Sequence, residues 1–448
     1  MDTPICDFVR AYSQSDTLRL HMPGHKGGSL LGMESMDITE IRGADSLYEA
    51  DGIIARSEAN ASKLFGCQTV YSTEGSSQCI RAMLYLLQLR AKQLGRSPLI
   101  AAGRNAHKTF LTGAALLDIP VRWLYPEEGG SYLSCHLSAG ELERYLASAE
   151  EMPVAVYLTS PDYLGNMLDI TALAEVAHRH GVLLAVDNAH GAYLKFLPQS
   201  MHPMDLGADI CCDSAHKTLP ALTGAAYLHL SEELHAALGH QVKNAMMLFG
   251  STSPSYLILQ SLDAVNEYLE SYPGYLATFA EAVQKWKARL HAWGYRLCGN
   301  EPLKLTVCAG SYGYTGSELA EHLRLQHMEP EYSDRDHLVL MLTPELGEDG
   351  LACIARAMCS LPKKEAVPEA APRVVPGRQR MMPRQALLSP SEILRIDECL
   401  GRILAVPMVG CPPAVPILIC GEEITEHAME CLRYYGISVC SVVKEGSE

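Results

Sequence analysis

Two neighbouring stretches of this sequence decide its fold: VLLAVDNAH at residues 182–190 and ICCDSAHKT at residues 210–218. Each starts with a short apolar run of the kind that forms a buried strand, and then turns polar. Upstream, VAVYLT (154–159) is another such run, and it is followed by ITALAEVAHRH (170–180), whose apolar residues recur at helical spacing. Strand, helix and strand in this order predict an α/β fold with a mainly parallel sheet covered by helices.

The polar residues that follow these strands are the first candidates for chemistry, because ligands of open α/β sheets bind beyond the carboxyl ends of the strands. Lys217 is expected in a loop between two strands, where partial desolvation would make its amine nucleophilic. A lysine by itself is more often a surface residue. Here Ser214 and His216 precede it and Thr218 follows it, so groups suited to phosphate surround an amine.

Asp187 ends the strand-like run at 182–186, and a carboxylate in such a place needs a partner to stay ionised. A helix N-terminus or a loop backbone is the simpler partner, and a cationic ring nitrogen is the functional one. Pyridoxal phosphate is held by a lysine at its aldehyde and by an acid at its pyridinium nitrogen. Lys217 and Asp187 follow successive predicted strands, so together they favour this cofactor.

The segment TEGSSQCIRAM (73–83) predicts a helix that starts near Gly75, Ser76 and Ser77. Free backbone N–H groups at such an end bind phosphate, although serine also caps helices without any ligand. His107 follows a short apolar run, where an imidazole can stack on a planar cofactor, and His190 ends the first stretch quoted above. A histidine by itself more often has a purely structural role.

The composition is that of a globular protein with an acidic surface. Asp and Glu total 52 against 36 Lys and Arg in 448 residues, a formal charge of −16. This charge argues against nucleic acid or an anionic membrane as a partner. No signal peptide is expected at the acid-containing N-terminus, and prolines interrupt the apolar stretch at 405–420, so no membrane span is expected.

The 15 cysteines show no regular spacing. Several lie in apolar runs, where they are expected to be buried: Cys211, Cys212, Cys308 and Cys353. This usage favours a reducing compartment, and hence a cytoplasmic location. No metal site is predicted, because the spacing of the cysteines and histidines matches no zinc pattern.

A proline-rich break divides the chain near its C-terminus. The segment at 362–384, PKKEAVPEAAPRVVPGRQRMMPR, contains five prolines and no apolar period, so it is predicted to be a linker. The expected organisation is an N-terminal arm (1–20), a large cofactor-binding domain (21–254), a smaller α+β domain (255–361) that begins with a helix over 257–269, the linker, and a C-terminal domain (385–448).

Seven short motifs occur in order along the chain: HMPGHKGG (21–28), EGSSQCIRAM (74–83), RNAHKT (104–109), LTSPDYLGN (158–166), VDNAHGAYLKF (186–196), DSAHKTLPALTG (213–224) and STSPSYLILQSLD (251–263). The tail GRILAVPMVGCPPAVPILICGEEI (401–424) follows them. Each motif alone is weak. Together, over nearly the whole chain, they resemble the bacterial Orn/Lys/Arg decarboxylase family of fold-type-I pyridoxal phosphate enzymes, in a short form without the N-terminal wing domain.

The resemblance implies an aspartate-aminotransferase-like large domain with a mainly parallel sheet, a smaller α+β domain and a small C-terminal domain. It implies a homodimer with shared active sites that uses pyridoxal 5'-phosphate to convert a basic amino acid into its amine and CO2, feeding polyamine synthesis. Arginine is favoured over lysine and ornithine as the substrate. The position of the acidic groups that would bind the basic side chain stays open.

The resemblance also assigns roles to residues. Lys217 would bind the cofactor covalently, Asp187 would pair with the pyridinium nitrogen, and Lys217 or His216 would return a proton to the product. His107 would stack on the ring. The implied cofactor contacts are Lys217, Asp187, His107, Gly75, Ser76, Ser77, Ser214, His216, Ala189 and His190.

The sequence departs from the family pattern at several positions. Asn188 stands where a glutamate is usual, Gly224 where a glutamine is frequent, Val406 where a glutamate is usual, and Ala414 where a glycine is usual. The missing carboxylate at Val406 leaves the substrate open. Two alternatives remain. One is another fold-type-I reaction, such as transamination or elimination, which would use the same Lys217 and Asp187. The other is a cofactor-binding subunit with little activity.

Overall fold

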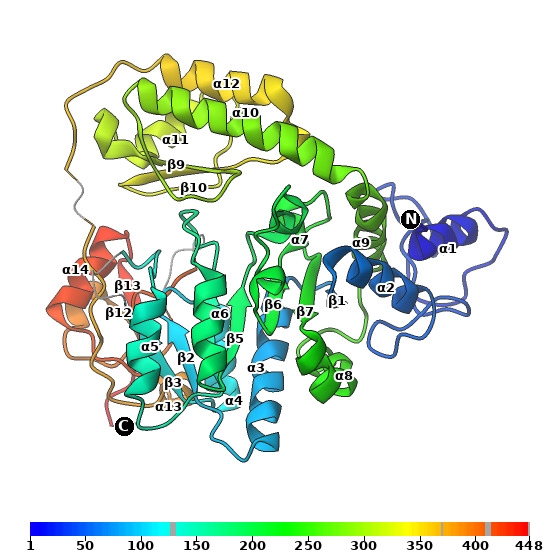
Figure 1. The fold of residues 1–448 in the computed structure, drawn as a ribbon, viewed down its shortest axis with the longest axis horizontal. Helices are drawn as coiled ribbons and strands as arrows, with labels where there is room; N and C mark the ends of the chain where they lie inside the picture. Colours follow the sequence, from blue (N-terminus) through cyan, green and yellow to red (C-terminus); the bar gives the residue numbers. More distant parts are fainter. Residues whose placement is uncertain (126–130, 369–370, 408–413, 447–448) are drawn as a thin grey trace. The chain divides into compact units, whose positions relative to one another are not determined.

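The structure is a computed structural model that describes residues 1–125, 131–368, 371–407 and 414–446. It divides the chain into two compact units. The first unit comprises Met1–Pro98 and Gly181–Ala277, and the second comprises Leu99–His180 and Thr278–Glu448. Helix α10 (Tyr272–Ala292) contains one of the division points. Figure 1 shows the chain coloured by sequence, so that the separate segments of each unit can be followed.

The strands of the first unit lie in the order β1 (Gln68–Ser72), β7 (Ala226–Leu230), β6 (Ile210–Asp213) and β5 (Leu183–Asp187). β5 and β6 are parallel, and β7 runs antiparallel to its neighbours β6 and β1. Nearly all of these strand residues are buried, as expected for a sheet covered on both faces. The strands predicted from the apolar runs at 182–186 and 210–212 are confirmed.

Helices surround this part of the sheet, and their starts agree with the sequence signals. The helix predicted near Ser76 begins there and continues to Gln93, and the helix predicted over 257–269 begins one residue earlier. The first-unit helices are α1 (Pro4–Ser13), α2 (Ile53–Phe65), α3 (Ser76–Gln93), α7 (Ala215–Thr218), α8 (Glu232–Met247) and α9 (Tyr256–Leu269).

Lys217 lies in the one-turn helix α7, so the prediction that it lies in a loop is wrong. The backbone N–H of Leu219 donates to the carbonyl of Ala215 at 2.8 Å and closes the turn. Leu219 is extended because it precedes Pro220, which disfavours helical geometry in the residue before it. The turn therefore ends where the sequence requires, between β6 and β7.

The second unit contains three parallel strands in the order β4 (Ala155–Thr159), β2 (Ile100–Gly103) and β3 (Val121–Leu124). The strand predicted at 154–159 and the helix predicted at 170–180 are confirmed. The helices α4 (Lys108–Leu117), α5 (Ala139–Ala147) and α6 (Ile170–Arg179) accompany these strands. Among strands β1 to β7, the described pairs are thus parallel except around β7, in agreement with the predicted α/β fold.

A four-stranded antiparallel sheet forms the rest of the predicted smaller domain within this unit. Its order is β10 (Tyr332–Ser333), β11 (His337–Met341), β9 (Lys304–Cys308) and β8 (Arg296–Cys298). Helices α11 (Gly316–Arg324) and α12 (Gly347–Cys359) accompany it (Figure 1). This antiparallel arrangement agrees with the predicted α+β character of the region.

The C-terminal segment has its own apolar cluster, built around Ile396, Leu404, Ile424 and Val442. Its elements are α13 (Pro383–Leu388), β12 (Ser391–Arg395), α14 (Glu426–Tyr434) and β13 (Val439–Val443), with β12 antiparallel to β13. The described part of the segment at 362–384 contains no strand and no helix before α13. The domain boundaries drawn from the sequence stay a prediction.

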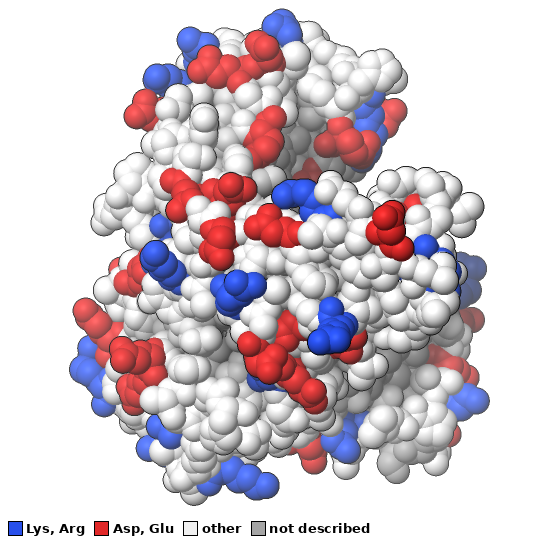
Figure 2. Space-filling view, turned by 90° about the vertical axis from the view of Figure 1, so that its right-hand side faces the viewer, with Lys and Arg blue, Asp and Glu red and all other residues white. Residues whose placement is uncertain are grey.

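Two surface properties follow from the structure. On the face drawn in Figure 2, acidic and basic side chains are interspersed rather than gathered into a basic patch. In the part of the chain that the structure describes, no helix combines the length and apolar character needed to cross a membrane.

Three of the four cysteines predicted to be buried are buried, but Cys353 is exposed. It lies on the face of α12 that turns away from the buried Leu351 and Ala355.

Candidate cofactor-binding site

The predicted amine lies at the carboxyl edge of the first unit's sheet. Nζ of Lys217, on α7 after β6, is 2.9 Å from Nε2 of His190, which follows β5. The two strands are parallel neighbours, with Asp187 facing Cys212 in register. Strand pairing therefore brings together two side chains that are 27 residues apart in sequence.

Asp187 is the last residue of β5, and only 2% of it is exposed. Its Oδ1 accepts a hydrogen bond from the backbone N–H of Ala189 at 3.2 Å, and the thiol of Cys212 donates to the same oxygen at 3.7 Å. A carboxylate at this depth is costly unless it meets positive charge. The position is suited to an aspartate that pairs with a cationic ring.

The start of α3 forms a cradle of hydroxyl and backbone groups. Oγ of Ser214 donates to Oγ of Ser76 at 2.9 Å, which places two predicted phosphate ligands side by side. Gly75 precedes the helix with a φ of +72°, and a Cβ built on it would meet nothing within 4 Å. Ser77 is the second residue of the same helix. Open space at a helix N-terminus, lined by hydroxyls, fits a phosphate dianion.

Gly224 explains one departure from the family pattern. The backbone N–H of Gly75 donates to its carbonyl at 2.8 Å. Its φ is +98°, and a Cβ there would lie 2.9 Å from the carbonyl oxygen of Thr73. A glutamine at this position would strain the backbone and push the loop away from the start of α3.

His216 and Thr218 flank the amine on α7. Nδ1 of His216 lies 2.9 Å from the carbonyl of Ala225, and since a carbonyl only accepts, this nitrogen carries the proton and Nε2 keeps its lone pair. Burial lowers the pKa of His216, which favours the neutral ring. Oγ1 of Thr218 is buried and meets no hydrogen-bond partner among the described residues, as expected of a group awaiting a ligand.

His107 belongs to the second unit, at the start of α4. Its Nδ1 accepts from the backbone N–H of Thr109 at 3.2 Å and lies 3.0 Å from the Thr109 hydroxyl. The imidazole thus caps α4, the structural role that the sequence left open. Stacking of His107 on a cofactor stays a prediction, as does the contact of Ala189, which lies buried two residues after Asp187.

A buried charge network under the site was not predicted. Asp213, the last residue of β6, has Oδ2 at 3.0 Å from Nε2 of His202 and 3.1 Å from Nε2 of His229. Asn188 donates to its Oδ1 at 2.7 Å, which gives the asparagine that replaces the usual glutamate a partner. The one signal in the sequence was a charged residue and a histidine inside apolar strands, at 213 and 229.

These residues fit pyridoxal phosphate. They supply an amine, a deeply buried carboxylate and an anion cradle at a single sheet edge of the first unit. Two tail residues that depart from the family pattern lie in the second unit: Val406 is half-buried, and Ala414 is buried with a φ of +58°. The neighbouring positions 408–413 lie outside the described residues.

Two models of one protein family match this chain. The family described as Orn/Lys/Arg decarboxylase, major domain, matches residues 3–291, and its C-terminal domain matches residues 368–441. The arginine decarboxylase of Bacillus subtilis is 27% identical over 460 residues, covering 95% of this chain and 92% of that protein. The arginine decarboxylase of Halalkalibacterium halodurans is 27% identical over 467 residues, covering 96% and 93%.

The solved structures agree in fold. The Francisella novicida lysine decarboxylase LdcF superposes with a TM-score of 0.80 at 17% identity, covering 99% of this chain and 81% of that chain. The constitutive lysine decarboxylase of E. coli gives a TM-score of 0.77 at 16% identity, covering 99% and 82%. At this identity the likeness concerns the fold.

Proposed function

This chain belongs to the Orn/Lys/Arg decarboxylase family, and from that premise we propose that it decarboxylates a basic amino acid with pyridoxal phosphate held at Lys217. The observation that carries the proposal is the placement of Lys217, His190 and buried Asp187 at one sheet edge. This arrangement supplies the amine and the carboxylate that the cofactor requires.

Each side chain has a task that follows from its place. Lys217 would bind the cofactor aldehyde, and His190, 2.9 Å away, would orient the lysine amine. Asp187 would stabilise positive charge on the ring nitrogen, and Ser76 and Ser214 would hold the phosphate. When bound, the cofactor supplies the electron-withdrawing ring that stabilises the electrons left when the carboxyl group departs.

The reaction itself is balanced by one proton. The bond between the α-carbon and the carboxyl carbon breaks, CO2 leaves, and a proton is added to the α-carbon. The ammonium form of Lys217 is the proposed donor at this edge. His216, whose ring is neutral at rest, could serve instead only after its Nε2 takes up a proton. A strong ion pair to the α-carboxylate of the substrate would oppose the loss of that group as neutral CO2. We therefore expect no arginine to bind this carboxylate.

Arginine is the proposed substrate, ahead of lysine and ornithine. The curated relatives named above are arginine decarboxylases, whereas the solved neighbours are lysine decarboxylases. The amine product would feed polyamine synthesis in the cytoplasm. The 14 described cysteines are free, which supports a reducing location.

A homodimer is part of the proposal. The segment at residues 18–33 exposes apolar side chains to an unusual degree, with Leu20 84%, Leu30 91% and Leu31 81% exposed. Apolar residues gathered in one segment in this way mark an interaction surface. A second copy of the chain is the partner that the resemblance implies.

Product analysis tests the proposed function. Purified protein is incubated with pyridoxal phosphate and arginine, lysine or ornithine in separate reactions, and the products are identified by mass spectrometry. The proposal predicts release of CO2 and agmatine from arginine. A keto acid would show transamination instead, and a protein that binds the cofactor but turns over none of the three amino acids would be a subunit with little activity.

A further inference from the structure

Two cysteines and a histidine meet in the four-stranded sheet of the second unit, and none of them belongs to the cofactor site. Cys298 is at the end of β8, Cys308 at the end of β9 and His337 at the start of β11. One potential ligand atom from each residue lies within 4.8 Å of the other two. The three positions are 10 and 29 residues apart along the chain, so their spacing matches no zinc-ligand motif.

Strand register explains why the side chains converge. His337 faces Cys308 directly across the β9–β11 pair. Cys298 faces Thr306 across the β8–β9 pair, and Thr306 lies two residues before Cys308. Because side chains two residues apart project from the same face of a sheet, all three ligands lie on one face.

The same register argues against a disulfide. Cys298 and Cys308 are diagonal neighbours, and such pairs are about 7–8 Å apart between Cα atoms. Disulfides rarely span more than about 7 Å between Cα atoms. Two sulfurs that lie within 4.8 Å of each other in diagonal positions are better bridged by a metal ion than joined directly.

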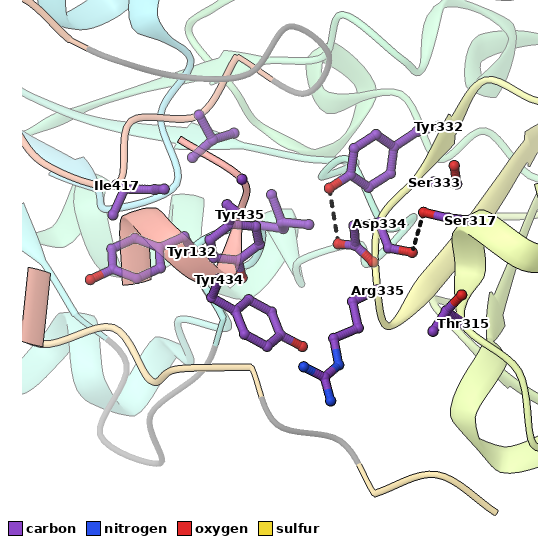
Figure 3. Close-up of a pocket in the computed structure, with 13 residues that line it drawn as sticks. Tyr132, Thr315, Ser317, Tyr332, Ser333, Asp334, Arg335, Ile417, Tyr434 and Tyr435 are labelled. Atoms are coloured by element: carbon purple, nitrogen blue, oxygen red, sulfur yellow. Dashed lines mark hydrogen bonds between the residues drawn. The ribbon is translucent and has the colours of Figure 1, made fainter. Parts of the chain in front are cut away.

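A carboxylate lies within ion-pair distance of the His337 imidazole, without a hydrogen bond to Nδ1 among the described residues. Oδ1 of Asp334 lies 3.5 Å from Nδ1 of His337. Backbone N–H groups of Asp336 and His337 donate to that oxygen at 2.8 and 2.6 Å, and the hydroxyl of Tyr332 donates to Oδ2 at 2.9 Å (Figure 3). A carboxylate held beside one ring nitrogen directs the other nitrogen toward a metal.

We propose that Cys298, Cys308 and His337 bind one divalent cation of the zinc type. Two thiolates and an imidazole are the donors that such an ion prefers. Tetrahedral zinc, with bonds of about 2.0–2.3 Å, needs donor atoms about 3.5–3.8 Å apart. Side-chain rotations that move the donor atoms by about 1 Å would therefore complete the site. Each cysteine loses its proton on binding, and water takes the fourth position.

The ion would fasten β8, β9 and β11 to one another. Cys308 is only 4% exposed, so a metal bound to its sulfur would be largely shielded from solvent. Asp334 also lines a pocket of about 450 Å³ with Tyr332, Arg335 and Tyr434, so this carboxylate links the pocket wall to the metal ligand. Metal binding is therefore expected to stabilise the protein independently of turnover.

Metal analysis of the holoprotein tests the proposal. Reduced protein is dialysed against metal-free buffer and its retained zinc is measured by mass spectrometry. The zinc is then removed with a chelator, and cobalt(II) is titrated in while the visible bands of thiolate-ligated cobalt are recorded. We expect one ion per chain. Cys298→Ser, Cys308→Ser and His337→Gln should each weaken binding at least about 100-fold, and Asp334→Asn about 10- to 100-fold. Cys353→Ser, at an exposed cysteine, should bind like the parent protein.

Thermal melting with and without zinc provides a second measurement for variants that fold poorly. The parent protein and Cys353→Ser should melt at higher temperature with zinc, and the three ligand variants should not. The proposal is overturned if the reduced parent protein binds no cobalt at one equivalent, if Cys308→Ser binds it as tightly as the parent, or if Cys298 and Cys308 form a disulfide that zinc does not prevent.

Discussion

The amine of Lys217 and the imidazole of His190 lie 2.9 Å apart, at the ends of two parallel strands. The local sequence marks each residue as a candidate, but only the pairing of β5 with β6 makes them neighbours. The contact fixes the direction in which the amine can point. It also ties the position of Lys217 to Asp187, which lies three residues before His190 on the same strand end.

Asp187→Asn tests the charge at the cofactor ring. Asparagine has nearly the same shape, but it does not stabilise a cationic ring nitrogen. We expect kcat to fall about 10²- to 10³-fold while the cofactor stays attached to Lys217. Steady-state kinetics and the cofactor content of the purified protein measure the two effects, and Asp16→Asn, at an exposed position, is the control. Normal kcat in Asp187→Asn would remove the aspartate from the mechanism.

Ser76→Ala tests the phosphate cradle. Its hydroxyl lies 2.9 Å from that of Ser214 at the start of α3. Loss of a hydrogen bond to a charged group costs about 1.5–3 kcal/mol, so the Kd for pyridoxal phosphate should rise about 10- to 100-fold. Pyridoxal, which lacks the phosphate, should bind as to the parent protein. The control is Ser271→Ala, because the Ser271 hydroxyl donates to the carbonyl of Tyr268 in its own helix region, at 3.2 Å. This variant should change neither Kd. If Ser76→Ala weakened the binding of pyridoxal as much as that of pyridoxal phosphate, the assignment would be contradicted.

The buried pair of Asp213 and His229 makes stability depend on pH. Burial opposes both charges, but His202 and His229 lower the pKa of Asp213, and Asp213 raises the pKa of His229. The contribution of Asp213 is present above the usual aspartate pKa of about 4 and is lost as the pH falls through its folded value. The contribution of His229 is present below the usual histidine pKa of about 6.5 and is lost as the pH rises through its folded value.

His229→Gln should therefore lower the free energy of unfolding by about 3–5 kcal/mol at about pH 6. The deficit relative to the parent protein should shrink at alkaline pH, where the parent loses the histidine charge. Thermal melting at a series of pH values measures it. Asp397→Asn breaks an exposed pair with Arg433 and should cost about 0–1 kcal/mol. A deficit that is constant across the pH series would show that His229 acts through packing alone.

Leu30→Asp with Leu31→Asp tests the proposed dimer. Both side chains are more than four-fifths exposed in the single chain, so charge there should not disturb the fold of one subunit. We expect sedimentation to change from a dimer to a monomer. Leu325→Asp, at an exposed leucine of the second unit, should remain dimeric. A parent protein that sediments as a monomer would refute the dimer directly.

Local signals predicted the parts of this molecule that depend on one segment of chain. Apolar runs predicted β5 and β6, and Gly75, Ser76 and Ser77 predicted the start of α3. The turn of helix around Lys217 was missed because a four-residue helix has no periodicity to detect. Cys353 was placed inside because an apolar run does not reveal which face of α12 it occupies.

Contacts that depend on strand register were beyond the sequence. The partners of Asp213 come from three segments, and their pairing requires the order β7-β6-β5. The same holds for Cys298, Cys308 and His337, which converge only because β9 lies between β8 and β11. His107 caps α4 because its non-helical backbone conformation, with a ψ of 148°, lets the ring accept from the N–H of Thr109. No sequence motif records that conformation.

Borohydride reduction tests the central claim most directly. The holoprotein is treated with sodium borohydride, which makes the bond between a lysine and the cofactor permanent, and its peptides are mapped by mass spectrometry. The account predicts a single pyridoxyl phosphate group on Lys217, and none in Lys217→Ala. A label on a different lysine, or a holoprotein that carries no covalent label, would contradict it.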